Sequence, residues 1–405
     1  MSSFWDLVRF EYKKIFKRKS TYITLFLALL AIVLGNVGTL IGHHYVDGIP
    51  KESKYESMVT DIEYARALAG RKLDSSLLLE TREAYAKIPE KERYITTMEY
   101  EQYARPYSSI RRIMIPVYNT GAQRFALEDL QNLSTKQAED FYTIRQSKVQ
   151  DVVQNTSLRD RSKEKLLHLD SNVKKPFVFD SIEGYQRFLV VMYTTGVMCC
   201  FAVAICIAPI FSEEYGTGAA QLILSSKYGK NKVIFAKLFT GISFATIIYM
   251  FLAVITYLEC MFLYGFDGAL AAFQLFQPLS VYPFNMWQVS AIFAGCILLA
   301  NIFTVAITLL LSSKFKSPFG VIIIISVITF TPMMMSVSET NILLYNLFHL
   351  LPSNMMTIWS TLSPIQYEMI NVSVSPFIFM PIFSLLMTIV LLPFAYHSFK
   401  NHQVL

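Results

Sequence analysis

The sequence "FLVVMYTTGVMCCFAVAICIAPIF", residues 188–211, is an apolar run in the middle of the chain. A helix needs about 20 such residues to cross the hydrocarbon core of a bilayer. Inside lipid a helix also satisfies its own backbone hydrogen bonds, which a single extended strand cannot do. The run therefore predicts a membrane-spanning helix.

The rest of the chain repeats this pattern. Of the 405 residues, 53% are hydrophobic and 16% are charged, and the mean hydropathy is +0.40. These values lie outside the usual range for a soluble globular protein. Further apolar runs of spanning length are Thr21–Gly42, Leu238–Tyr264, Val289–Leu311, Pro318–Met335 and Pro376–Tyr396. The predicted fold class is an all-α polytopic membrane protein with six transmembrane helices.

The distribution of basic residues predicts the orientation of these spans. Lys and Arg gather before the first run, between the second and third, between the fourth and fifth, and after the sixth, whereas residues 265–288 and 336–375 contain neither. Short cytoplasmic loops carry an excess of Lys and Arg, so we expect both termini to be cytoplasmic. The basic residues behind the net charge of +6 are thus distributed as membrane topology requires, and they do not form a single surface for nucleic acid. We expect a multi-pass protein of the cell membrane.

The long segment 43–187, between the first two runs, is expected to form an extracytoplasmic and mostly helical domain. Long domains cross the membrane largely regardless of charge. Its stretches "KYESMVTDIEYARALAGRKL" and "STKQAEDFYTIRQSKVQDVVQN" are rich in helix formers, and Ser134 with Gln137 makes a capping box. An apolar stripe is predicted to pack against a neighbouring helix: Phe141, Ile144, Val149 and Val152. Prolines divide the segment, so several stacked helices are expected.

Residues 1–20 precede the first span and have the pattern of an amphipathic helix. Its apolar face is predicted to hold Phe4, Leu7, Val8, Tyr12 and Ile15, and its basic face Arg9, Lys13 and Lys17. Such a helix lies in the cytoplasmic interface, with its apolar side toward membrane lipids and its lysines toward anionic headgroups. The alternative is a merely basic tail that obeys the topology rule.

Two further features concern helix packing. Small residues recur every four positions in the second span, at Gly196, Cys200, Ala204 and Ala208. They let helix backbones approach closely in lipid. We expect this face to pack on another span of the same subunit, and the alternative is a span of a second subunit. All five cysteines fall within predicted spans, which favours small packing residues over disulfides or metal ligands. A cysteine-free outer domain is compatible with a bacterial cell surface.

The predicted outer segment at about 340–370 is apolar but interrupted by Pro352 and Pro364. Each piece is too short to cross the bilayer, so we expect re-entrant or interfacial helices in the outer leaflet. Tyr345, Trp359 and Tyr367 are expected at headgroup depth, where aromatic residues are enriched.

The sequence does not contain the motifs of several enzyme classes. The phosphate loop G-x-x-x-x-G-K-[ST], the HExxH zinc motif, a CxxC pair and the GxSxG elbow are all missing. We therefore predict no catalytic residue and no metal ligand in this chain. Acidic residues within the spans are too few for a proton or ion relay, which argues against an ion-driven carrier.

One polar stretch stands between the second and third spans: "SEEYGTGAAQLILSSKYGKNKVIFAKL", residues 212–238. It begins with two acids, continues as a short apolar helix and a polar turn, and ends with a lysine at the start of the third span. An apolar helix exposed at the cytoplasmic face is the kind of surface that binds a partner.

This pattern resembles the cytoplasmic coupling segment of type-2 ATP-binding-cassette (ABC) transporter permeases. The resemblance includes an acidic pair, Gly-Thr, a leucine-rich helix, a polar turn with a basic residue, and a lysine before the next span. The matching residues are Glu213, Glu214, Gly216, Thr217, Leu222, Leu224, Ser225, Lys230 and Lys237. The amphipathic first helix, the six spans and the broken helices before the last span also fit. The insert after the first span departs from the shortest members and is similar to a subgroup that includes lipid exporters.

The resemblance implies a permease subunit that is not itself an enzyme. A separate ABC ATPase subunit would bind ATP and Mg, with no cofactor in this chain, and coupling segment 212–237 would lie in a cleft of that subunit. Two permeases, as a homodimer or with a related chain, would pair with two ATPases. The cargo would be amphipathic or hydrophobic, such as an antimicrobial peptide, a lipid or a drug. The alternative function is a membrane-anchored sensor or scaffold that binds a ligand or envelope partner through the outer domain.

Overall fold

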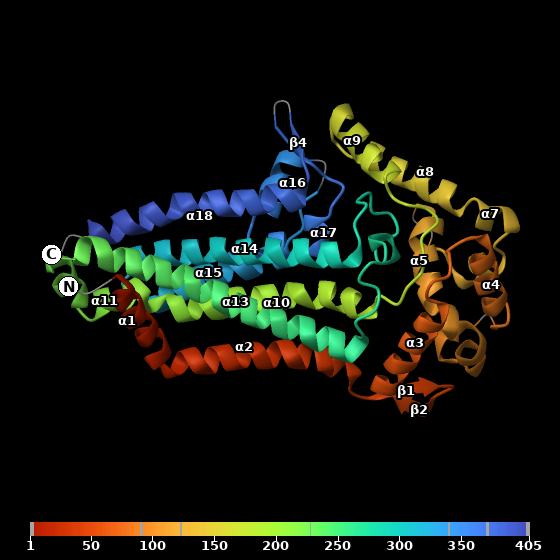
Figure 1. The fold of residues 1–405 in the computed structure, drawn as a ribbon, viewed down its shortest axis with the longest axis horizontal. Helices are drawn as coiled ribbons and strands as arrows, with labels where there is room; N and C mark the ends of the chain where they lie inside the picture. Colours follow the sequence, from red (N-terminus) through yellow and green to blue (C-terminus); the bar gives the residue numbers. More distant parts are fainter. Residues whose placement is uncertain are drawn as a thin grey trace.

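The computed structural model describes residues 4–89, 91, 93–121, 124–226, 228–338, 341–369 and 372–401. It has two parts, a long bundle of helices and a smaller domain at one end of it (Figure 1). The termini lie at the opposite end of the bundle. Because the smaller domain is inserted between the first two long helices, we call it the insert domain, residues 43–182.

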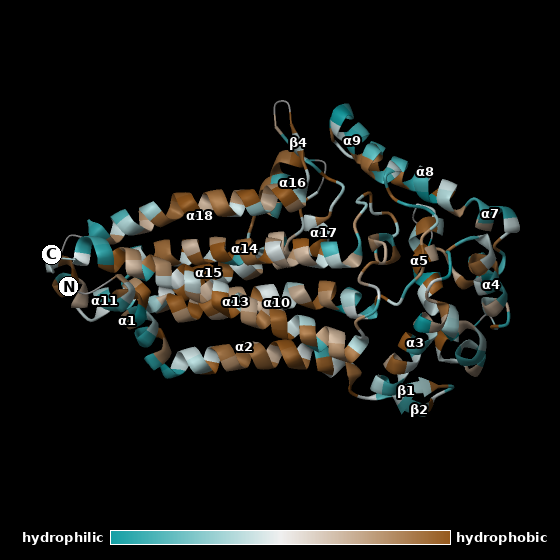
Figure 2. Cartoon of the chain, viewed as in Figure 1, coloured by the Kyte–Doolittle hydropathy of each residue, from teal (hydrophilic) through white to brown (hydrophobic). Residues whose placement is uncertain are grey.

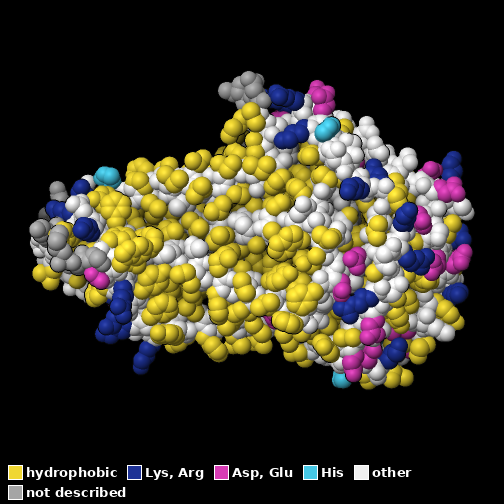
Figure 3. Space-filling view, in the orientation of Figure 1, with side chains coloured by type: hydrophobic (Ala, Val, Ile, Leu, Met, Phe, Trp, Pro, Cys, Tyr) yellow, Lys and Arg dark blue, Asp and Glu magenta, His cyan; other side chains and the backbone are white. Residues whose placement is uncertain are grey.

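Among the described residues, five helices are long and apolar enough to cross a membrane. They are α2 (Lys19–Val37, extended by η1, Gly38–Leu40), α10 (Glu183–Ile207), α13 (Ile234–Tyr264), α14 (Met286–Lys314) and α18 (Pro376–Lys400). The middle of the bundle is hydrophobic in both the hydropathy colouring and the space-filling view (Figures 2 and 3). Lys and Arg gather at the α1 end, and charges of both signs cover the insert domain (Figure 3). These features fit an all-α polytopic membrane protein.

The sixth predicted span differs from the other five. It consists of α15 (Pro318–Phe330) and η7 (Thr331–Met334), and together they form an apolar helix of 17 residues. The α-helical part rises about 1.5 Å per residue and the 3₁₀ turn about 2 Å. The segment is therefore somewhat shorter than the usual bilayer-crossing helix.

Helix α10 is the centre of the bundle. In its most apolar window 67% of the residues are buried, compared with 17% in α2 and in α18, so α10 is enclosed by its neighbours. A Cβ added at Gly196 would lie 2.6 Å from Ile297 Cγ2 of α14, so a larger residue would force Ile297 or one of the two helices to move. Cys200 is buried as well, and Ala204 and Ala208 form a cluster with two residues of α15, Val321 and Ile325. The predicted small-residue face thus packs within this subunit.

The insert domain begins with a hairpin that the sequence analysis did not predict. Strand β1 (His43–Val46) pairs antiparallel with β2 (Ile49–Ser53). The turn is Asp47-Gly48, and both residues have positive φ, 48° and 81°. Asp-Gly is the usual sequence of such two-residue turns, so the signal was present but embedded in a segment that otherwise favoured helix.

The rest of the insert domain is helical, as predicted. Its elements are α3 (Lys54–Leu68), α4 (Ser75–Tyr85), η2 (Tyr94–Thr96), η3 (Tyr100–Ala104), η4 (Arg105–Tyr107), α5 (Ser108–Tyr118), α6 (Leu127–Gln131), α7 (Thr135–Glu139), α8 (Phe141–Gln154) and α9 (Asp160–Ser171). The Ser134–Gln137 capping box is confirmed. The predicted stripe is partly wrong: Phe141 and Val149 are buried, but Val152 is 44% exposed and its neighbour Val153 is buried instead. The buried residues of α8 recur every four positions, at Phe141, Arg145, Val149 and Val153, whereas the prediction placed Val152 three residues after Val149.

Short elements close the insert-domain end of the bundle. They are η6 (Phe273–Leu275), α16 (Ile342–His349), η8 (Asn354–Met356), α17 (Ile358–Thr361) and the two-residue strands β3 (Tyr367–Glu368) and β4 (Ser373–Val374). The predicted short helices near 340–370 are therefore present, although residues 339–340 and 370–371 lie outside the described residues. Trp359 is exposed. Tyr367 is instead buried and stacked on Phe379, with ring centroids 4.2 Å apart, so it packs inside the protein.

Candidate functional site

Helix α1 (Phe4–Lys17) lies across the end of the bundle (Figure 1). It is separated from α2 by Arg18, whose backbone is extended, with φ −78° and ψ 123°. Val8 and Ile15 are buried, and the Tyr12 hydroxyl is 2.8 Å from Ser243 Oγ of α13.

The predicted apolar face of α1 is therefore in contact with protein. Phe4 and Leu7 are half-buried, and Phe4 packs edge-on against Phe239 of α13. The residues of the basic face, Arg9, Lys13 and Lys17, are exposed. Much of the face that we expected to meet lipid thus packs on α13.

The predicted coupling segment forms three short elements. Helix α11 (Pro209–Gly216) continues directly from α10, α12 (Ala219–Ser225) follows a turn, and η5 (Gly229–Val233) leads into α13. The turn before α12 has Gly218 at φ 72°, which favours glycine. A Cβ at Gly229 would lie 1.5 Å from Ile223 O, so only glycine allows η5 to pass this close to α12. Lys227 lies outside the described residues.

The segment is joined to α1 by a group of charges that are buried except for the half-exposed Lys14, and we call it the α1 ion cluster: Glu11, Lys14, Glu214 and Lys237. Lys237 is fully buried, and its Nζ lies 3.1 Å from Glu11 Oε2 and 2.7 Å from Glu214 Oε1. It also donates to the carbonyl of Ile210 at 2.9 Å. Lys14 pairs with Glu214 as well. Two carboxylates and two ammonium groups balance each other, as buried charges require.

A second ion pair lies beside this cluster, between Arg18 and Glu213. An open pocket of about 320 Å³ lies between α1 and α11, lined by Lys14, Lys17, Arg18, Glu213, Glu214 and Thr217. These contacts therefore fasten α1, α11 and α13 to one another. They lie at the end of the bundle where α10 ends and α13 begins.

The structure divides the nine predicted coupling residues into two groups. Glu214, Leu224 and Lys237 are buried, so their side chains hold the segment together and do not meet a partner directly. The other six residues are exposed. Glu213 lies at the edge of this group, and we call the remaining five the exposed coupling face: Gly216, Thr217, Leu222, Ser225 and Lys230. Leu222 is 76% exposed on a helix outside the apolar middle of the bundle.

Sequence reasoning missed Glu11, Lys14 and Arg18 as members of the site. Glu11 occupies the apolar face of α1, because it stands three residues after Val8 and four before Ile15. An acid at that position must have a buried cation as partner. That mismatch was the available signal, although it does not identify Lys237 as the partner.

The insert domain contains a second charged group around Arg105, at the start of η4. The guanidinium is buried and lies 2.8 Å from Glu52 Oε1, 2.8 Å from Asp61 Oδ1 and 2.7 Å from Glu101 Oε2. It also donates to the carbonyl and hydroxyl of Ser57. Arg105 therefore joins the hairpin, α3 and η3.

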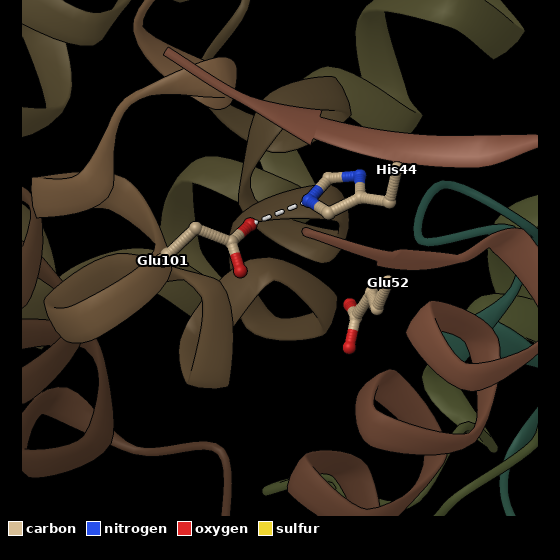
Figure 4. A group of neighbouring side chains, drawn as sticks. All are labelled: His44, Glu52 and Glu101. Atoms are coloured by element: carbon tan, nitrogen blue, oxygen red, sulfur yellow. Dashed lines mark hydrogen bonds and ion pairs between the residues drawn. The ribbon is translucent and has the colours of Figure 1, made fainter. Parts of the chain in front are cut away.

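His44, Glu52 and Glu101 approach one another closely enough to resemble a metal site (Figure 4), with ligand atoms within 4.8 Å. However, both carboxylates already accept hydrogen bonds from Arg105 Nη1, and Lys51 Nζ is 2.9 Å from Glu101. A metal ion would have to displace these cations. The group is better explained as a charge-compensated network that fixes the hairpin.

This network predicts a pH dependence. Burial raises the pKa of Glu101, but the hydrogen bonds from Lys51, His44 and Arg105 outweigh it and hold the pKa below the ordinary 4.5. The stabilisation is present above pH 4.5 and is lost as the pH falls through the lower pKa of the folded state. Burial raises the pKa of Asp61. Its contribution to the free energy of unfolding therefore falls as the pH rises, opposite to that of Glu101.

The test compares the wild-type full chain with the Glu101→Gln variant. Below pH 4.5 the wild type should lose hydrogen-exchange protection in residues 43–53 and 100–107, after correction for intrinsic rates. Glu101→Gln should be less protected at pH 7 and lose less on acidification. Equal slopes for both proteins would contradict the assignment.

No protein-family model, curated protein or solved structure matches the chain. Its possible function therefore has to be argued from the geometry of the site.

Proposed function

We propose that this chain is the transmembrane permease subunit of an ABC exporter, driven by a separate ATP-hydrolysing subunit that docks on the exposed coupling face. The observation that carries the proposal is the position of Leu222. Its side chain is 76% exposed on the short helix α12. The α1 ion cluster fixes the neighbouring helices α11 and α13 to α1. A short helix that presents an apolar side chain at the end of the bundle can lie in a hydrophobic groove of a partner.

The same geometry suggests how a movement of the partner would reach the bundle. Helix α11 is continuous with the central helix α10, and η5 is continuous with α13. A push on α12 would therefore be carried into two long helices at once, with α1 moving as part of the same unit. Rigid-body movement of packed helices is a common switching transition.

The proposal includes a topology. The α1 end is cytoplasmic, the insert domain is extracytoplasmic at a bacterial cell membrane, and α15 with η7 is the sixth crossing. The charge distribution supports it, because Lys and Arg cluster at the α1 end (Figure 3). Two permeases, identical or related, would pair with two ATPases that bind ATP and Mg. The cargo would be an amphipathic or hydrophobic peptide, lipid or drug.

Two neighbouring leucines give a matched test of the docking surface. Leu222→Asp changes an exposed residue, so we expect the free energy of unfolding to change by less than about 0.5 kcal/mol. Leu224→Asp places a carboxylate at a position only 7% exposed, which should cost several kcal/mol. We expect Leu222→Asp to fold normally but to lose the ATPase partner, and Leu224→Asp to lower the yield of folded protein.

The partner can be identified by crosslinking. A photoreactive amino acid at position 222, in cells that naturally make the protein, should capture a protein that contains the phosphate-loop motif. The same probe at the exposed Lys136 of the insert domain should not capture it. If position 222 captures no such protein, or if Leu222→Asp retains the ATPase, the permease proposal is wrong and the sensor or scaffold function becomes the better explanation.

A further inference from the structure

The insert domain contains a cavity of about 500 Å³ that is lined by both polar and apolar side chains. It lies beneath α3 and α5 and reaches the bundle, because its lining includes Glu183 at the start of α10 and Tyr264 at the end of α13. Ligand sites in proteins are commonly cavities of about 300–1,000 Å³ with a few convergent polar groups. The size and position therefore permit a bound small molecule.

Part of the cavity wall is aromatic. Tyr85, Tyr94 and Tyr100 line the cavity together with the apolar side chain of Ile95, and Tyr264 lines it from the end of α13. The Tyr94 and Tyr100 rings pack edge to face, with centroids 6.0 Å apart, and Tyr85 packs in the same way on Tyr100. Such a wall suits a ligand with an aromatic or apolar body.

The charges that line the cavity are paired, with one exception. Arg105 is bound by Glu52, Asp61 and Glu101, as described above. Arg112 lies 2.6 Å from Glu183. Arg111 has no carboxylate partner among the residues that the structure describes, and its Nε is buried without a hydrogen-bond acceptor there. Its guanidinium stands 5.7 Å from the ring centroids of both Tyr85 and Tyr94.

An unsatisfied buried donor costs free energy, and a charged one costs more. Arg111 lines the cavity, and an anion that enters would form charge-assisted hydrogen bonds with the terminal nitrogens of its guanidinium. Within the described part of the cavity lining, Arg111 is the guanidinium without a carboxylate partner, and Asp61, Glu101 and Glu183 would repel a second negative charge. A singly charged carboxylate fits this balance better than a phosphate dianion.

We infer that this cavity binds a monoanionic organic carboxylate with an aromatic or apolar body, and that Arg111 holds the carboxylate. The rings of Tyr85 and Tyr94 hold the guanidinium in place, and the half-buried rings of Tyr94 and Tyr100 are offered to the body of the ligand. The inference does not depend on the permease proposal. Because Glu183 and Tyr264 belong to α10 and α13, an occupied cavity would contact the ends of two long helices.

The test uses the purified full chain in lipid nanodiscs and two pairs of probes. N-acetyl-phenylalanine and N-acetyl-diphenylalanine carry the carboxylate, and their C-terminal amides differ only in lacking it. Calorimetric titration should show saturable binding of at least one acid, with its amide at least tenfold weaker. Arg111→Gln should weaken the acid at least tenfold, and Arg111→Lys should retain part of the affinity.

Two further variants separate binding from folding. Arg124→Gln removes the same charge from an exposed position outside the cavity lining and should leave binding unchanged. Ile95→Trp fills the mouth at a residue that is 53% exposed, so it should block binding without unfolding the domain. Unfolding temperatures within error of the wild type would establish that the variants are folded. Failure of both acids to bind, equal binding of acid and amide, or full affinity in Arg111→Gln would overturn the inference.

Discussion

Replacing Lys237 with methionine is expected to destabilise the α1 end of the bundle by about 3–5 kcal/mol, the usual cost of removing one partner from a buried ion pair. Lys237 is fully buried and contacts both Glu11 and Glu214. Without it these carboxylates stay enclosed, and only the half-exposed Lys14 can compensate them. The aliphatic volume is retained by methionine, so the effect arises from the lost charge.

Trp5 offers a local measurement of this effect. Its ring lies 5.7 Å from that of Phe239, across the contact between α1 and α13. With Trp287 and Trp359 changed to Phe, its fluorescence should report the release of α1. We expect Lys237→Met to release α1 at a lower denaturant concentration or temperature than the wild type.

The controls follow from the same contacts. Lys13→Met makes the same chemical change at an exposed position of α1 and should alter stability by less than about 0.5 kcal/mol. Lys237→Met combined with Glu11→Gln and Glu214→Gln removes the uncompensated charges, so it should recover part of the loss. If the triple variant is no more stable than the single one, the charge balance is not what holds α1.

This result would also bear on the proposed coupling. If α1 is released while α12 stays folded, then Leu222 remains exposed and the ATPase should still bind. Stimulation of its activity should nevertheless fall, because a push on α12 would no longer move α1 with the bundle. Loss of coupling with retained binding would distinguish the α1 ion cluster from the exposed coupling face.

The sequence predicted the long helices because an apolar run of about 20 residues has essentially one stable arrangement in lipid. It also predicted the small-residue face at Gly196 and Ala204, because their spacing is local. It did not show that Lys237 meets Glu11, since the two are 226 positions apart and no periodicity relates them.

The same limit explains which part of the candidate site was found. The exposed coupling face lies within one short segment and was recognised as a pattern. The division between Leu222 outside and Leu224 inside depends on how α12 is rotated against the bundle. Ala220 and Leu224 are the buried residues of α12 and belong to the apolar core, and this packing is a tertiary contact that the segment alone does not specify.

Arg145 of α8 is the second residue whose loss should have a large effect. It is fully buried, and its Nη1 lies 2.8 Å from Asp170 Oδ1 of α9. Its Nε and Nη2 donate to the carbonyls of Pro278 and Ser280, at 2.7 and 2.8 Å. These carbonyls belong to the loop between α13 and α14, so one side chain fastens the insert domain to the bundle.

Arg145→Met would leave Asp170 buried without its cation and remove the donors from both carbonyls, which should cost about 3–5 kcal/mol. Arg145→Lys should recover only part of this, because an ammonium cannot reproduce the planar fork of a guanidinium. Hydrogen exchange should show loss of protection in residues 141–154 and 273–285. Arg124→Met, the same change at an exposed position, should leave both regions protected. If Arg145→Met weakens α8 but not the 273–285 loop, then Arg145 stabilises the insert domain internally, and other contacts must fasten it to the membrane helices.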